Sequence, residues 1–313
     1  MKYIVSLIIL ISIGISQNNN LSGLVFYNYA YDLSEDAVND AGFGLDRVYL
    51  TYTADLSEDL SYKFQADMQN KNTSEKSAYY MYIKNAKVDW RSPLGKITLG
   101  MQGMNVFNVV EKTWGFRFLQ KSPMDKYKFS SSADLGIGYS GKFNVINYSF
   151  MITNGSGYKN TEDDKYKKIS AQFVFGEKKL VKNDGYNIGL VYAQEPYSDS
   201  ESKNLISFFG GYAKNGFRFG GEFDMHNDSG TKINEQIKAI YGSYKLNTEL
   251  ELLIYYDMFD PDLDTEDDGT TFLRTGINYY PTKGLIITPN IYIKSDDTGD
   301  ESTYMMLNFQ FKI

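Results

Sequence analysis

Hydrophobic and polar residues alternate along most of this chain, and the alternation is clearest at its end. In the last twelve residues, one set of side chains is mostly apolar: Thr303, Met305, Leu307, Phe309, Phe311 and Ile313. The residues between them are largely polar. Because successive side chains of a β-strand point to opposite faces, this segment is predicted to be a strand with one apolar and one polar face. Such a strand fits a barrel wall with lipid outside and water inside.

The same alternation recurs upstream, although segment 79–90 does not alternate cleanly. Counting the last strand, we predict about sixteen strands, an even number as in bacterial single-chain barrels. The predicted strands are 22–31, 43–56, 60–69, 79–90, 96–103, 132–140, 143–153, 166–176, 186–194, 205–214, 217–226, 236–246, 248–259, 271–280, 285–294 and 303–313. The predicted fold is therefore all-β, a transmembrane antiparallel up-and-down β-barrel.

The connections between these strands alternate in length. Short ones at 57–59, 92–94, 141–142, 215–216 and 281–283 interleave with longer ones. Barrels of this kind have short periplasmic turns and longer extracellular loops, which places both chain termini in the periplasm. Asn215-Gly216 is a strong two-residue hairpin signal. The connection around 177–185 is longer than this rule predicts, and the sequence offers no account of it.

The first residues have the features of an export signal. Lys2 supplies a positive charge, an apolar run follows from residue 3 to 13, and Gly14 and Ser16 are small residues suited to cleavage before Gln17. A membrane anchor is the alternative, but a spanning helix needs about 20 apolar residues. We therefore expect a cleaved signal peptide at 1–16, a barrel at 17–313, and a location in the bacterial outer membrane.

Composition agrees with this expectation and excludes some partners. There is no cysteine, so disulfides and thiol chemistry are unavailable. The 27 tyrosines and 20 phenylalanines are enough for aromatic girdles at two membrane interfaces. A formal net charge of −7 argues against nucleic acid as a partner. The expected partners are outer-membrane lipid, lipopolysaccharide and small hydrophilic solutes or ions.

The longest connection, 104–131, would be the third extracellular loop. It is too apolar to lie comfortably in water, with Val106, Phe107, Val109 and Trp114 among its residues, so we expect it to fold into the lumen. Its five cations and two carboxylates give it a net charge of +3. A narrow passage lined by charge selects ions electrostatically. The candidate constriction residues are Glu111, Lys112, Arg117, Lys121, Asp125 and Lys126. In the alternative reading, these charges only hold the loop against carboxylates of the wall.

Alternation also predicts which charged side chains of the strands face the lumen. Placing Arg or Lys at the middle of the lipid layer costs about 2–4 kcal/mol, so such residues should point inward. The candidate wall residues are Arg47, Lys63, Lys96, Arg218, Glu222 and Arg274. Because both signs of charge occur, the sequence leaves the preference between anions and cations open.

Sixteen strands, a long third loop and the run Glu111-Lys112-Thr113-Trp114-Gly115-Phe116-Arg117 resemble the general diffusion porins of the outer membrane, and also the phosphate-selective porin group. The resemblance covers the mature chain in architecture. It implies a passive aqueous channel for small hydrophilic solutes and ions, a homotrimer, and a third loop folded into each barrel. One departure is the terminus, since many such barrels end on phenylalanine and here Lys312 and Ile313 follow Phe311.

Other functions find little support in the residues. His226 is the single histidine and follows Asp224 by two positions, an Asp-His pair such as outer-membrane proteases use, but a lumen-lining histidine without a catalytic role is expected. No phosphate-binding glycine loop or metal cluster occurs, so neither enzyme activity nor a metal or cofactor is expected. The glycine pairs 210–211 and 220–221 should allow bending or close packing.

A second function remains open from the sequence. The outer loops around 260–268 and 296–301 are crowded with Asp and Glu. Such loops could contact divalent cations or lipopolysaccharide, because hard cations prefer oxygen ligands. The alternative is therefore a structural or adhesive barrel with a blocked lumen.

Overall fold

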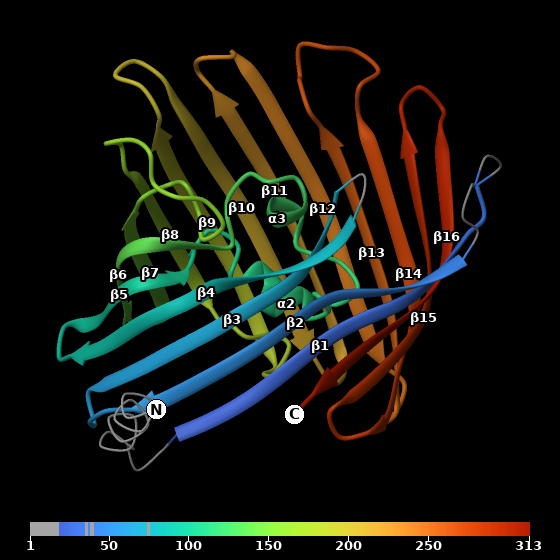
Figure 1. Cartoon of the computed structure of the whole chain (residues 1–313), viewed down its shortest axis with the longest axis horizontal. Helices are drawn as coiled ribbons and strands as arrows, with labels where there is room; N and C mark the ends of the chain where they lie inside the picture. The colour runs from blue at the N-terminus through green and yellow to red at the C-terminus, as the bar shows by residue number, and fades with distance from the viewer. Residues whose placement is uncertain (1–18, 35–36, 38–40, 74–75) are drawn as a thin grey trace, which may run out of the picture.

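The described residues, 19–34, 37, 41–73 and 76–313 of a computed structural model, form one closed antiparallel sheet. Each strand pairs with its neighbours in sequence, and β1 pairs with β16 to close the ring (Figure 1). The predicted sixteen-stranded all-β barrel is thus confirmed. The predicted signal peptide, 1–16, lies outside the described residues. Among the helices described, none is long and apolar enough to cross a membrane.

The strands follow the predicted order along the chain, and two short helices that were not predicted lie between β5 and β6. They are β1 (Asn19–Asp32), β2 (Ala41–Asp55), β3 (Leu60–Thr73), β4 (Lys76–Ser92), β5 (Gly95–Gly103), α2 (Val110–Trp114), α3 (Pro123–Lys126), β6 (Ala133–Phe143), β7 (Ile146–Thr153), β8 (Lys168–Gly176), β9 (Gly185–Pro196), β10 (Ser202–Lys214), β11 (Phe217–Asp228), β12 (Ile233–Lys245), β13 (Leu250–Asp260), β14 (Thr270–Thr282), β15 (Leu285–Asp296) and β16 (Glu301–Lys312).

The last strand shows how the alternation is used. The Phe309 ring stacks on the Tyr27 ring of β1 with 4.4 Å between centroids, and Met305 on the same face is 51% exposed. Asn308, on the opposite face, is 2% exposed and accepts a hydrogen bond from Asn290 of β15. Apolar side chains therefore cover the outside of the barrel, and polar side chains bond to one another inside it.

A β-bulge explains why segment 79–90 alternates poorly. Gln65 of β3 pairs with Asn85 and the next residue, Ala66, pairs with Ile83, which leaves Lys84 as an extra residue of β4. A bulge places two residues of one strand opposite one of its partner. Lys84 and Asn85 are accordingly both buried, although they are adjacent in sequence. The bulge also brings the Nζ atom of Lys84 within 3.9 Å of Asp67.

Two predicted turns are misplaced, and the reason is backbone geometry. The turn predicted at 141–142 lies at 144–145, because β6 continues through Phe143. That predicted at 281–283 lies at 283–284. Each true turn contains a residue that tolerates positive φ, Asn144 at 53° and Gly284 at 89°. The turn at Asn215-Gly216, with φ values of 52° and 82°, is where it was predicted.

Candidate functional site

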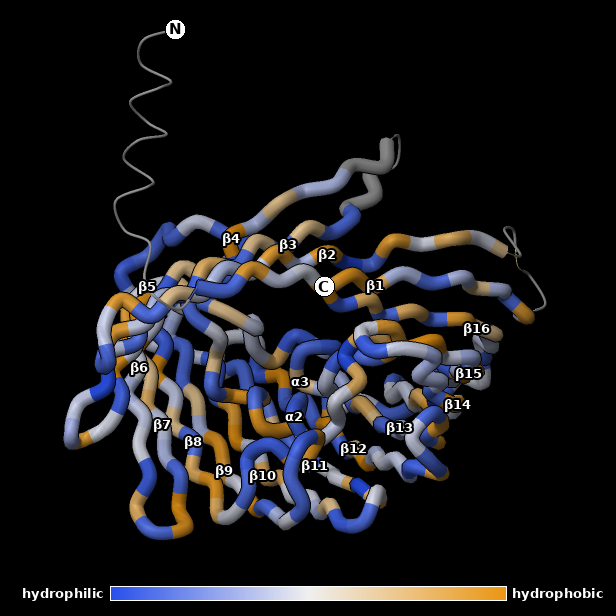
Figure 2. The backbone as a smooth tube through the Cα atoms, turned by 90° about the horizontal axis from the view of Figure 1, so that it is seen from below, coloured by the Kyte–Doolittle hydropathy of each residue, from blue (hydrophilic) through white to orange (hydrophobic). Residues whose placement is uncertain are grey.

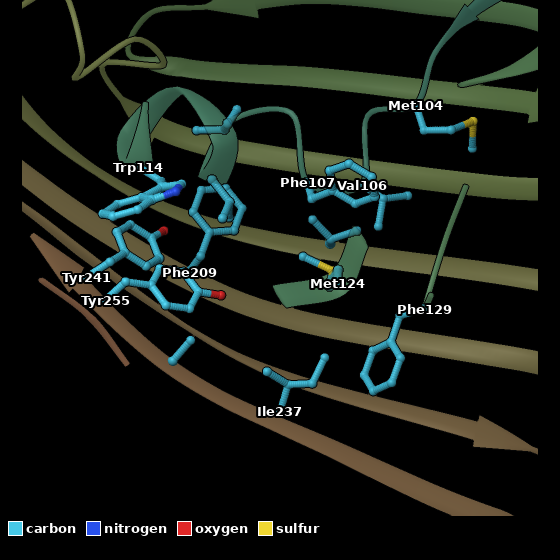
Figure 3. Packing of buried hydrophobic residues seen from close by; sticks show 14 of the residues in the cluster. Met104, Val106, Phe107, Trp114, Met124, Phe129, Phe209, Ile237, Tyr241 and Tyr255 are labelled. Carbon is cyan, nitrogen blue, oxygen red and sulfur yellow. The ribbon is translucent and has the colours of Figure 1, made fainter. Parts of the chain in front are cut away.

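Segment 104–131, called the third loop from here on, leaves β5, forms α2 and α3, and returns to β6. Val106, Val110 and Met124 have no exposed surface, and Trp114 is 2% exposed. Figure 3 shows Trp114 beside Tyr241 and Tyr255, whose ring centroids lie 5.8 and 5.1 Å from its own. These tyrosines are buried residues of β12 and β13. Figure 2 shows α2 and α3 within the ring of strands.

Polar contacts attach the third loop to the wall at several strands. Near its start, Asn105 accepts a hydrogen bond from Ser170 of β8, with 2.7 Å between Oδ1 and Oγ. At the end of α2, the Trp114 carbonyl accepts one from Arg218 of β11 at 3.1 Å. Both Asn105 and Arg218 are buried. These directed bonds fix the loop to β8 and β11, and apolar packing reaches β1, where the Phe118 ring lies 6.2 Å from that of Phe26.

The strongest attachment is at Asp257 of β13, which is fully buried. Its carboxylate accepts hydrogen bonds from the Lys126 Nζ at 3.0 Å and from the Tyr127 hydroxyl at 2.6 Å. The Lys126 Nζ also lies 3.7 Å from the centroid of the Phe272 ring, a cation–π contact. For Lys126, the arrangement thus matches the alternative reading, in which a loop charge holds the loop against the wall.

Three other predicted constriction residues pair with one another. Arg117 forms ion pairs with Glu111 and with Asp125, the second at 2.6 Å. Burial alone would raise the pKa of Asp125, but the positive charges of Arg117 and Lys121 outweigh it and the pKa is lowered. Arg117 therefore closes the third loop on itself, and its charge is balanced within the loop.

Lys112 and Lys121, the remaining two, keep exposed side chains and form no ion pair among the described residues. The surrounding protein keeps water away from both ammonium groups, and this desolvation lowers the pKa of each. The two observations are compatible, since the protein around a side chain can displace water from much of its surroundings while part of its surface stays exposed. Lys128 is likewise exposed and without an ion pair in the described residues, so Lys112, Lys121 and Lys128 are the unpaired cations of the loop.

The predicted wall residues fall into two groups. Arg47 and Lys96 each lie near a carboxylate, at 3.5 Å from Asp67 and 3.2 Å from Asp89, and Lys63 is half-buried on β3. Arg218, Glu222 and Arg274 are 7%, 6% and 5% exposed. Arg218 contacts α2, whereas Arg274 donates to Asn290 of the neighbouring strand. Glu222 has neither carboxylate oxygen hydrogen-bonded in the described part of the chain.

One glycine of each predicted pair serves close packing against α2. A Cβ atom added to Gly211 or to Gly220 would lie 2.7 Å from the Thr113 Cγ2 atom of α2. That separation is shorter than carbon atoms tolerate, so α2 can approach β10 and β11 this closely because these two positions lack side chains.

The sequence analysis did not predict that a second segment contacts the third loop. This segment is the connection Glu177 to Asp184 between β8 and β9, called the long turn from here on. It lies at the barrel end that carries the short turns. The N–H of Val181 donates to the Lys112 carbonyl of α2 at 2.9 Å, and Leu180 is 3% exposed. The available signal was the length of this turn together with the apolar pair Leu180-Val181 between lysines.

His226 is not arranged for catalysis with Asp224. Its Nδ1 lies 2.5 Å from Glu235 of β12, and its ring stacks on Phe129 of the third loop at 4.9 Å. Both carboxylate oxygens of Asp224 lack a hydrogen-bond partner in the described residues. The histidine thus supports the loop from the wall.

No protein-family model and no curated protein sequence matches this chain. Solved structures of similar fold do exist. The anion-selective porin from Comamonas acidovorans has a TM-score of 0.67 at 14% identity, over 95% of this chain and 99% of that one. The outer membrane channel DcaP of Acinetobacter baumannii has a TM-score of 0.67 at 11% identity, over 95% of this chain and 97% of that one. OmpF of Salmonella typhi has a TM-score of 0.65 at 10% identity, over 94% of this chain and 97% of that one. At these identities, the likeness establishes a shared barrel fold.

Proposed function

We propose that this protein is a porin of the bacterial outer membrane, a passive water-filled channel for small hydrophilic solutes and ions. The observation that carries the proposal is the attachment of the third loop to β8, β11 and β13 of its own barrel. A loop held there narrows the passage. The fold shared with an anion-selective porin and with DcaP supports this function. Transport then needs no energy input, because solutes follow their own gradients.

Filtering in this channel combines size and charge at the third loop. Arg117 and Lys126 are paired with carboxylates, so the positive field of the loop comes from Lys112, Lys121 and Lys128. Cations lining a narrow passage favour anions. The long loops then lie outside the cell and the short turns in the periplasm.

The assembly belongs to the same proposal. A homotrimer is supported by a similar Vibrio cholerae outer membrane protein whose structure is described as a trimer form. The apolar outer face would contact membrane lipid, with lipopolysaccharide at its outer rim. No catalysis is proposed, because the one histidine is engaged with Glu235 and Phe129.

Single-channel recording of the refolded mature chain, 17–313, in a planar bilayer tests this function. Steady steps on the order of a nanosiemens are expected for a barrel of this width. Deletion of 106–126 should raise the conductance, whereas deletion of 261–268, in an outer loop away from the passage, should leave it unchanged. Silence from demonstrably folded barrels would instead favour the structural or adhesive barrel with a blocked lumen.

A further inference from the structure

A second outer connection also folds into the barrel. Segment 154–167 joins β7 to β8 and is called the fourth loop from here on. Its start is held by Asp134 of β6, which is 2% exposed. The Asp134 carboxylate accepts hydrogen bonds from the N–H groups of Gly155 at 2.6 Å and of Gly157 at 3.2 Å. The fourth loop is therefore fixed beside β6, next to the end of the third loop.

The third and fourth loops are in direct contact there. A Cβ atom added to Gly157 would lie 2.5 Å from the Oγ atom of Ser131, the last residue of the third loop. Gly157 has φ 77°, so both its conformation and its surroundings require glycine. The next residue, Tyr158, donates its backbone N–H to the Ala133 carbonyl at 3.0 Å. These contacts fix the direction in which the fourth loop leaves β6.

From β6 the fourth loop reaches the inner face of β3. The Tyr158 hydroxyl donates to the Asp67 carboxylate at 2.8 Å, and the Lys159 Nζ donates to Gln69 Oε1 at 2.7 Å. Asp67 is fully buried and stands directly opposite Tyr82 of β4, so these two side chains share the inner face of the wall. The Tyr158 ring meets the Tyr82 ring edge-on, with 6.2 Å between centroids. The fourth loop therefore lies inside the barrel.

The two loops are attached to opposite sides of the ring. In the closed barrel β3 stands opposite β11, with β4 to β10 on one side and β12 to β2 on the other. Figure 2 shows α2 beside β11, with β3 across the ring from both. The third loop is bonded to β11 through Arg218, and the fourth loop is bonded to β3 through Asp67 and Gln69. The lumen is therefore narrowed from two opposite sides.

Lys159 is held in place although its side chain is exposed. Besides the bond to Gln69, its Nζ lies 5.7 Å from the centroid of the Tyr82 ring and 5.6 Å from that of the Tyr158 ring. Cation–π contacts of this kind add to the hydrogen bond and limit the positions that a long side chain can adopt. The Lys159 side chain thus has a defined place on the inner wall while part of its surface stays open.

We propose that the fourth loop forms a second side of the constriction, in which Tyr158 positions the loop on β3 and Lys159 lines the passage across from the third loop. The proposal rests on the function proposed above and adds a residue that sets the size limit of the channel. A solute entering from outside then passes between two loops. The size limit therefore depends on the fourth loop as well as on the third.

Attachment of a bulky group at residue 159 tests whether this position lines the passage. The chain has no cysteine, so Lys159→Cys introduces a single thiol. A bulky methanethiosulfonate reagent should lower the single-channel current in a lasting step, and a reducing agent should restore it. Lys167→Cys is the matched control, because Lys167 belongs to the same loop but donates to Glu162, and the reagent should leave its current unchanged. Complete modification of Lys159→Cys, confirmed by mass, without a change in current would overturn the proposal while the porin stands.

The exclusion of polymers measures the size limit itself. Polyethylene glycols of graded mass lower the current only when they enter the channel, and Tyr158→Ala/Lys159→Ala should admit polymers that the wild-type channel excludes. Tyr166→Ala/Lys167→Ala removes the same two residue types from the same loop and should leave the limit unchanged, because the Tyr166 hydroxyl is bonded to Asp199 of an outer connection. An unchanged limit in the first variant would contradict the second constriction. Folded wild-type barrels without any current would overturn the porin and this proposal together.

Discussion

The Nζ atom of Lys126 lies 3.0 Å from each carboxylate oxygen of Asp257, although the two residues are 131 positions apart in sequence. The pair joins the third loop to β13 and compensates the charge of Lys126. The residue that the sequence offered as part of a charge filter thereby becomes an anchor. Its partner is fully buried, so breaking the pair leaves a charge without compensation.

Replacing the anchor should loosen the third loop without unfolding the barrel. In Asp257→Asn, Lys126 loses its counter-charge, and we expect a loss of about 1–3 kcal/mol in loop attachment, seen as noisier and larger channel currents. Asp163→Asn removes an exposed carboxylate from another outer loop and serves as the control. A double-mutant cycle with Lys126→Met measures the coupling. Strictly additive effects would mean that the pair does not hold the loop.

Close packing of α2 predicts a substitution and its rescue. Gly211→Ala should destabilise the folded barrel by about 1–3 kcal/mol through overpacking against Thr113, measured by urea unfolding in detergent. Thr113→Ser removes the methyl group and should recover part of the loss. Gly210→Ala is the neighbouring control, because its Cβ would meet nothing nearer than a carbonyl oxygen at 3.4 Å. Equal effects at 210 and 211 would contradict this packing.

Lys121 should influence selectivity more than charges outside the passage do. In Lys121→Glu the exposed cation of the third loop becomes an anion, so the ratio of chloride to potassium permeability should fall about fivefold. The reversal potential in a KCl gradient measures this ratio. Lys232→Glu makes the same change at an exposed outer turn between β11 and β12 and should have a much smaller effect. If both variants shift the potential equally, Lys121 does not face the passage.

The lowered pKa of Lys121 makes the selectivity depend on pH. Burial lowers this pKa below the ordinary lysine value of 10.5, with Asp125 opposing. The ammonium is charged below its pKa and neutral above it, so raising the pH removes this cation earlier than it would an ordinary lysine. The anion preference should therefore decline as the pH rises, and at a lower pH than an ordinary lysine would cause. Lys121→Arg should remove most of that decline, because a guanidinium stays protonated there.

The sequence by itself determined the strands, since alternation of side chains is a local property of each strand. It predicted sixteen strands and the length and apolar character of the third loop, all of which depend on neighbours in sequence. Even the misplaced turns at 144–145 and 283–284 differ by a few residues, because strand ends are decided by which residue accepts positive φ.

The tertiary structure decided which charges remain free. Closing the barrel brings Asp257 to Lys126. Folding of the loop brings Arg117 to Glu111 and Asp125. The alternation of apolar and polar residues does not predict these ion pairs. The inward course of the long turn depends on contacts with Gly115 and Gly211, which belong to segments distant in sequence. Alternation specifies the face of a strand on which a side chain lies, whereas its partner there depends on the other segments that fold against that face.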